Sequence, residues 1–126
     1  MISVSLLVDK ERTVGFEIRG HADYSEHGSD IVCSAVTILA YACVNTLDKY
    51  ATEVEFVDDG DLLRLFSQDK SDEIDVVFDY FATGVETLLG NYSDYVKLNY
   101  KETWNDIKYK FTKIVKQKGS FFFKER

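Results

Sequence analysis

The sequence contains no proline, one tryptophan, and only two cysteines and two histidines in 126 residues. Since it has neither a Cys-x-x-Cys pair nor a cluster of histidines, we expect no metal site and no cofactor. The cysteines, Cys33 and Cys43, would lie about 15 Å apart if both are on one helix, which is beyond the reach of a disulfide. We therefore expect free thiols and a reducing compartment.

The sequence also lacks a long apolar run. The nearest approach to the roughly 20 residues that span a bilayer is residues 31–44, which contain Cys33, Ser34 and Thr37. The N-terminus has no basic stretch followed by an apolar one, as a secretory signal would have. With 45% hydrophobic and 14% aromatic residues, the chain is too apolar to be disordered. We expect one folded domain in the cytoplasm, without a membrane partner.

Acidic and basic residues are unevenly distributed. Residues 1–100 carry seven Lys/Arg against nineteen Asp/Glu, whereas residues 101–126 carry eight against three. An acidic body repels nucleic acid and favours basic partners. The basic segment is open to RNA, a membrane surface or the chain's own acidic body, although a solvated basic helix is the simpler interpretation. We expect no nucleic-acid partner except through this segment.

Hydrophobic periodicity and turn residues predict the order ββαββαβ(α). The expected elements are strands 2–8 and 14–18, a helix capped by Ser29 or Asp30 that runs to about Lys49, strands 52–57 and 61–66 across Asp59-Gly60, a helix from Ser71 to about Gly90, a strand at 94–100, and a helix from Thr103 to Gly119. This order favours an α+β fold with two main helices on a mixed or antiparallel sheet of about five strands, plus an extra C-terminal helix. The expected domains are residues 1–100 and a basic helical extension, residues 101–126.

The two cysteines differ in their predicted places on the first helix. At 100° per residue, one face carries Val32, Ala35, Val36, Leu39, Cys43 and Leu47, and the other side carries Asp30, Cys33, Ser34, Thr37, Tyr41, Asn45 and Asp48. The first face is expected to be the core face, so Cys43 is interpreted as a small buried hydrophobe. Cys33 lies in the first helical turn, where the helix dipole favours a thiolate and unpaired N–H groups are available to a developing oxyanion.

His21 opens the loop that leads to this helix, and a loop of this length can bring its imidazole to the Cys33 sulfur. Histidine suits a general base for a cysteine nucleophile because its pKa lies near neutral pH. Two alternatives stay open: a structural role for His21, and the use of His27 as the base. Asp30 and Asp23 are candidates for orienting the imidazole, Ser34 for a supporting role, and Gly20 and Gly28 for loop hinges.

The residues Gly20-His21-Ala22, followed by Gly28-x-Asp30-Ile31-Val32-Cys33-Ser34-Ala35-Val36-Thr37, resemble the signature of the ribosomal-processing cysteine protease family, called Prp. The resemblance extends over residues 1–100. Ser34, Thr37 and Ser93 depart mildly from the family pattern, and residues 101–126 extend past its usual end.

The resemblance implies that Cys33 is the nucleophile and His21 the base, later the acid, of a catalytic dyad. It implies a cysteine endopeptidase that removes the N-terminal extension of large-subunit ribosomal protein number twenty-seven, after an apolar segment ending in paired phenylalanines. It also implies a homodimer with two helices on a sheet. The main alternative is a non-enzymatic ribosome-assembly factor that binds through the same acidic surface.

Overall fold

The structure is a computed structural model in which residues 1–26 and 30–103 are described. Its elements, in chain order, are β1 (Ile2–Asp9), β2 (Arg12–Arg19), α1 (Ile31–Tyr50), β3 (Glu55–Asp58), β4 (Leu62–Phe66), α2 (Asp72–Tyr92) and β5 (Val96–Glu102). Apart from the last expected helix, every predicted element is present. That helix falls almost wholly outside the described residues.

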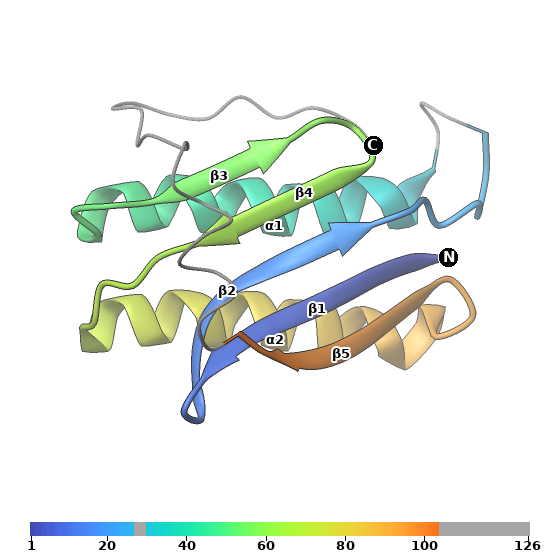
Figure 1. Cartoon of the computed structure of the whole chain (residues 1–126). Helices are drawn as coiled ribbons and strands as arrows, with labels where there is room; N and C mark the ends of the chain where they lie inside the picture. The colour runs from blue at the N-terminus through green and yellow to red at the C-terminus, as the bar shows by residue number, and fades with distance from the viewer. Residues whose placement is uncertain (27–29, 104–126) are drawn as a thin grey trace.

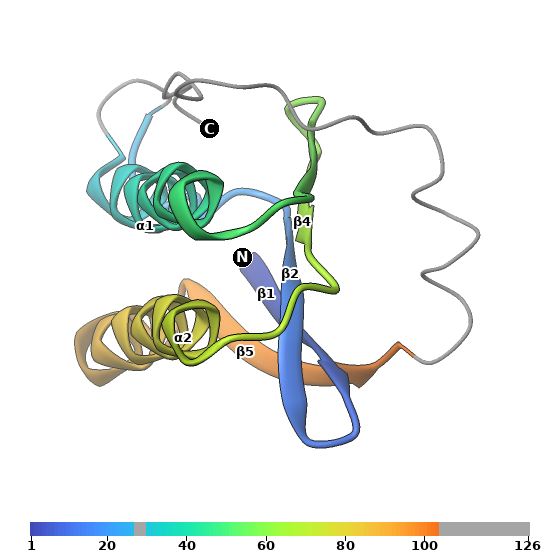
Figure 2. The same cartoon turned by 90° about the vertical axis from the view of Figure 1, so that its left-hand side faces the viewer.

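The five strands form one mixed sheet in the order β3-β4-β2-β1-β5. β5 pairs with β1 in parallel, and the other neighbours pair antiparallel. Both helices cover the same face of this sheet, as two views at right angles show (Figures 1 and 2). The prediction of an α+β fold with two helices on five strands is confirmed.

The core lies between the sheet and the two helices. Phe16 of β2 stacks on Phe81 of α2 with ring centroids 3.8 Å apart, and both side chains are buried. The helices also approach closely, because a Cβ atom at Gly84 would lie 2.6 Å from Leu39 Cδ2. Burial of these apolar groups is the main force that holds the layers together.

α1 is buried on more sides than the sequence predicted. Val32, Val36, Cys43 and Leu47 are buried as expected, but so are three residues assigned to the opposite side: Cys33, Thr37 and Tyr41. Tyr41 donates a hydrogen bond of 2.7 Å to Asp58 of β3, which shows that a second neighbour covers this side. The helical-wheel prediction was wrong here because it assumed one apolar neighbour.

α1 is also long and apolar enough, by length and composition, to cross a membrane, and it is the one such helix among the described residues. Half of its apolar window is buried inside the fold. Contacts with the sheet and α2 therefore account for its apolar character.

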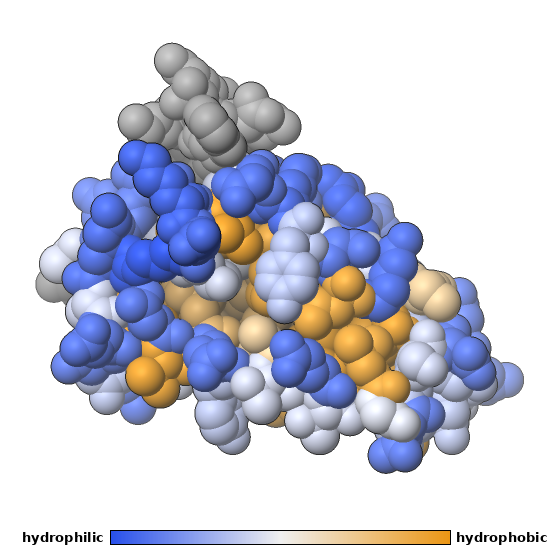
Figure 3. Space-filling view, turned by 90° about the horizontal axis from the view of Figure 1, so that it is seen from below, coloured by the Kyte–Doolittle hydropathy of each residue, from blue (hydrophilic) through white to orange (hydrophobic). Residues whose placement is uncertain are grey.

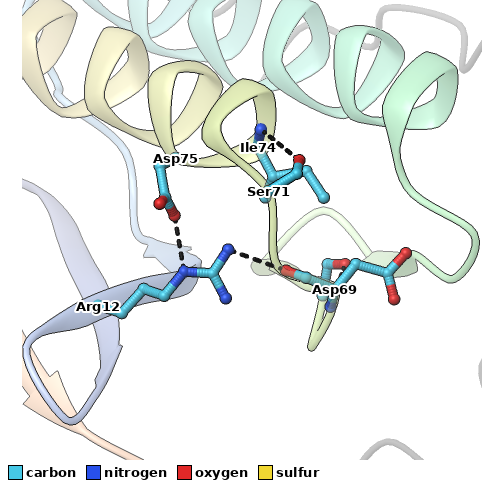
Figure 4. A network of polar contacts seen from close by, with 6 residues as sticks. Arg12, Asp69, Ser71, Ile74 and Asp75 are labelled. Carbon is cyan, nitrogen blue, oxygen red and sulfur yellow. Dashed lines mark hydrogen bonds and ion pairs between the residues drawn. The ribbon is translucent and has the colours of Figure 1, made fainter.

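Polar contacts fix the start of α2 (Figure 4). Ser71 accepts a hydrogen bond of 3.2 Å from the Ile74 amide, which confirms it as the N-cap. Arg12, at the start of β2, donates to Asp75 at 2.7 Å and to the Asp69 carbonyl oxygen at 3.1 Å. These contacts join the first hairpin to the second helix.

α2 ends two residues later than predicted. It continues through Gly90 to Tyr92, and Ser93 is its C-cap. A glycine inside a helix costs only about 1 kcal/mol, and tertiary contacts of Tyr92 outweigh this local stop signal: its ring meets that of Tyr24 edge-on.

Candidate active site

Cys33 lies in the first turn of α1, as the sequence predicted, and forms no disulfide with the other cysteine, Cys43. The residue is only 2% exposed. The backbone N–H of Ala22 donates a hydrogen bond to its sulfur at 3.2 Å. An N–H directed at sulfur, close to the positive end of a helix dipole, favours negative charge on that atom. The loop before α1 therefore both covers and polarises this thiol.

Asp30 is the N-cap of α1, and its carboxylate is almost fully occupied. One oxygen accepts from the amides of Val32 and Cys33, both at 3.0 Å. The other accepts from Tyr24 at 2.9 Å and Ser25 at 3.3 Å. Burial alone would raise the pKa of Asp30, but the four backbone N–H groups stabilise the carboxylate and hold its pKa below the usual value. Asp30 thus ties the loop to the helix.

The amides at the start of α1 are consequently engaged. Val32 and Cys33 donate to the Asp30 carboxylate, and the Ser34 amide donates to the Asp30 carbonyl oxygen at 3.0 Å. The sequence had suggested that unpaired N–H groups of this turn are available to a developing oxyanion. In the described conformation the side chain and carbonyl of Asp30 hold these three donors instead.

His21 is exposed and immediately precedes Ala22, the residue whose amide contacts sulfur. Within residues 1–26 and 30–103, no hydrogen bond or ion pair of the His21 side chain is present. Asp23, a candidate orienter, is directed elsewhere, with its carboxylate 4.0 Å from the N-terminal ammonium. The backbone amide that follows His21 therefore contacts the Cys33 sulfur, but the His21 side chain does not form a hydrogen bond with it in the described conformation. His27 and Gly28 lie outside the described residues.

Gly20 shapes the chain just before His21. Its φ is +80°, and a Cβ atom there would lie 2.6 Å from the Met1 carbonyl oxygen. Both the left-handed backbone and the close approach require glycine. Gly20 therefore sets the direction in which the loop leaves β2, and its role as a hinge stays a prediction.

Tyr24 anchors the same loop, and sequence reasoning missed it. Its ring meets those of Tyr92 and Tyr95 edge-on, with centroids 5.7 Å and 5.0 Å apart. Such aromatic pairs add about 1 kcal/mol to simple burial. Because the partners lie some 70 residues away in sequence, no local spacing could have revealed the contact.

Cys43 has a different environment. It is buried in the core, as predicted, and this burial raises the pKa of its thiol. A buried neutral thiol is a poor nucleophile. Among the described residues, no group of three or more His, Cys, Asp or Glu side chains is placed to hold a metal ion.

Comparisons with known proteins identify the family of this chain. Residues 1–97 match the family model of the cysteine protease Prp. The chain belongs to the Prp family of cysteine proteases. The ribosomal processing cysteine protease Prp of Staphylococcus aureus is 30% identical over 106 residues, covering 80% of this chain and 100% of the relative. The Bacillus subtilis Prp is 44% identical over 34 residues, 27% of this chain and 30% of the relative.

Solved Prp structures share the fold. The Staphylococcus aureus Prp in complex with a covalently linked product peptide has a TM-score of 0.72 and 28% identity, over 80% of this chain and 100% of that one. The same Prp protease with a substrate peptide gives 0.69 at 28% identity over the same shares. A Streptococcus mutans protein gives 0.67 at 26% identity, over 81% of this chain and 95% of that one. The chain is therefore a cysteine protease.

Proposed function

We propose that this chain is an endopeptidase whose catalytic dyad is Cys33 as nucleophile and His21 as general base and acid. The observation that carries the proposal is the hydrogen bond from Ala22 to the Cys33 sulfur. It places a thiol at a helix start, under the backbone adjoining a histidine. The buried, electrically neutral setting of Cys43 supports the choice of Cys33.

In the proposed reaction, His21 takes the proton of Cys33, and the thiolate attacks the carbonyl carbon of the scissile peptide bond. The tetrahedral intermediate collapses as the C–N bond breaks, and the protonated His21 gives its proton to the leaving amine. Water, deprotonated by His21, then attacks the thioester carbon, and the C–S bond breaks. The protonated His21 returns its proton to the Cys33 sulfur, and the carboxylic acid product leaves and ionises in solvent.

The loop must move for this reaction, because Cys33 is 2% exposed and His21 makes no side-chain hydrogen bond among the described residues. A bound peptide would displace the Ala22 amide from the sulfur and allow the His21 imidazole to turn toward it. The Ala22 N–H, freed from sulfur, is then a candidate donor to the oxyanion. We assign supporting roles to Asp30, as the anchor of the loop and cap of α1, and to Ser34, in the same helical turn. Gly20 and Gly28 are the proposed hinges.

The proposed substrate is the N-terminal extension of large-subunit ribosomal protein number twenty-seven, cut after an apolar segment ending in two phenylalanines. The Staphylococcus aureus relative is named as a ribosomal processing protease and binds a substrate peptide. The acidic body of residues 1–100 would steer a basic ribosomal protein toward the site. We further propose a cytoplasmic homodimer, with residues 1–100 as the protease domain and residues 101–126 as an extension.

The test is incubation of the purified protein with a peptide that carries this extension and its Phe-Phe segment. The parent protein should cut it once, and Cys33→Ala and His21→Ala should each reduce the rate at least about a thousandfold. Cys43→Ala is the matched control and should cut at close to the parent rate.

Mass spectrometry of the quenched reaction should find the acyl group on Cys33. Normal cleavage by His21→Ala would overturn the dyad and direct attention to His27. No cleavage of this peptide, with cleavage of other peptides, would overturn the substrate while leaving the dyad intact. If no peptide is cut and Cys33→Ala binds the ribosomal protein like the parent, the assembly-factor alternative is favoured.

A further inference from the structure

An apolar groove of about 540 Å³ lies between α1 and α2. Its lining includes Leu39 and Tyr50 of α1, and Val76 and Tyr80 of α2. Three of these side chains remain open to solvent: Tyr50 is 55% exposed, Val76 65% and Tyr80 73%. A view from below, on the side of α2 and β5, shows apolar surface between hydrophilic side chains (Figure 3). Apolar surface gathered in a groove with a polar border is typical of a site that binds another polypeptide.

The two helices that form this groove are acidic. Asp72 and Glu73 belong to its lining, and the whole of α2 has five acidic residues and no basic one. α1 adds one of each sign, Asp48 and Lys49. The two helices together thus carry six acidic residues against one basic residue. A polypeptide that fits the groove therefore combines apolar side chains for its floor with basic side chains for its border.

A second copy of this chain does not have this combination of properties. A two-fold contact through the groove would bring the same surface of both copies together. Each α2 helix, with its five carboxylates, would then face another surface of the same charge, and like charges repel across an interface. A basic partner is favoured instead. The substrate of the proposed reaction is such a partner, because ribosomal proteins carry basic residues that bind RNA phosphates.

The groove lies at some distance from the proposed nucleophile but along the same helix. Cys33 is the third residue of α1, and the part of the lining that belongs to α1 extends from Leu39 to Tyr50. At 1.5 Å per residue, these two positions lie about 9 Å and about 25 Å from Cys33 along the helix axis. An extended chain held at Cys33 needs at least about eight residues to reach Tyr50. The groove is therefore accessible to parts of a substrate that lie well away from the bond that is cut.

We propose that the groove between α1 and α2 binds the mature part of the ribosomal substrate, which follows the cut bond. This inference rests on the proposed function. Apolar side chains of the substrate contact Val76 and Tyr80, and its lysines or arginines lie near Asp72 and Glu73. The groove contributes affinity for the whole substrate and takes no part in the chemistry at Cys33. It thereby distinguishes the substrate from other proteins that contain two adjacent phenylalanines.

The test compares the full-length ribosomal precursor with a peptide of about four residues on either side of the cut bond, which is too short to span the groove. Tyr80→Lys places a positive charge in the groove. It should raise the KM of the precursor about tenfold, as the loss of a central aromatic contact does, and leave its kcat and the cleavage of the peptide unchanged. Tyr100→Lys is the matched control, because Tyr100 is 66% exposed and lies on β5, outside the groove lining. It adds the same charge and should leave the KM at the parent value.

Calorimetry with the mature ribosomal protein, which lacks the extension, tests the docking without cleavage. The parent should bind it, Tyr100→Lys should bind it equally well, and Tyr80→Lys about tenfold more weakly. Val76→Ser, which removes apolar surface without adding charge, should weaken binding about threefold and replaces Tyr80→Lys if that variant does not fold.

Equal binding by the parent and the groove variants, or no binding by the parent, would overturn the docking whether or not the precursor is cut. A dimer that dissociates in Tyr80→Lys but not in Tyr100→Lys would also overturn it, because the groove would then be an interface between copies. Weakened binding by the groove variants alone, without cleavage of either substrate, would support the docking and overturn the proposed cleavage.

Discussion

The two halves of α1 hold the two cysteines of the chain in contrasting ways. At the N-terminal end, Cys33 is buried, and the backbone N–H of Ala22 in the preceding loop donates a hydrogen bond to its sulfur. In the C-terminal half, Cys43 is buried in the hydrophobic core and lines an apolar groove between α1 and α2. Both thiols are nearly inaccessible, yet a loop opens locally at a small cost, whereas separation of two packed helices requires much of the fold to open. The reactivity of each thiol should therefore depend on whether a loop or packed helices bury it, and not on its exposed area.

The two ends of α1 also have a feature in common. At each, one aspartate accepts several hydrogen bonds from the chain that enters or leaves the helix. Asp30 holds four backbone amides before and within the first turn. Asp69 accepts from the amides of Thr52 and Glu53 and from the Thr52 hydroxyl, just after the last turn. Asp30 is buried and Asp69 is only half-buried. We therefore expect Asp30 to contribute more to the free energy of unfolding than Asp69.

The largest expected effect is the difference in alkylation of the two thiols. In the folded protein at neutral pH, Cys33 should react with iodoacetamide on the order of a hundredfold faster than Cys43. The physical reason is local opening of the loop over Cys33, while burial raises the pKa of Cys43. Peptide mapping after timed quenching measures both rates in one sample. Equal alkylation rates of Cys33 and Cys43 in the native protein would contradict this prediction.

A smaller effect is expected on stability. Asp30→Ala should lower the free energy of unfolding by about 2 kcal/mol, because it leaves buried amides without an acceptor. Asp69→Ala should cost about 1 kcal/mol, since water replaces its contacts more readily. Urea unfolding measures both, and Asp30→Asn, which keeps one acceptor oxygen, serves as the control. A larger loss for Asp69→Ala would show that the C-terminal end of α1 is the more firmly held one.

The smallest effect is a pH dependence confined to the N-terminal end. The lowered pKa of folded Asp30 means that its contribution to stability is complete above its ordinary value of 3.8. That contribution is lost as the pH falls through the lowered pKa. The free energy of unfolding of the parent should therefore decrease below about pH 4 more steeply than that of Asp30→Asn. If the free energy of unfolding falls with pH equally in the parent and in Asp30→Asn, the titration of Asp30 does not cause the loss of stability.

Local patterns in the sequence determined the elements of this protein and the position of one reactive residue. Alternation predicted the strands, Asp30 and Ser71 predicted the helix starts, and the first-turn position of Cys33 followed from the cap. These features depend on neighbours within a few residues, so periodicity and capping rules reach them. The motif from Gly20 to Thr37 indicated the Prp family, because it combines a histidine and a cysteine on either side of a loop.

Only the tertiary structure decided how those residues are covered and connected. Cys33 is buried because residues 21–25 fold over it, and Tyr24 holds this loop through rings from the end of α2 and the turn after it. Tyr41 is buried because β3 lies against the side of α1 that a helical wheel assigns to solvent. Such contacts join segments far apart in sequence, and their energies depend on the packing of the whole sheet and not on local propensity. The sequence by itself therefore determined which thiol stands at a helix start, and the fold decided that a loop, and not a helix, covers it.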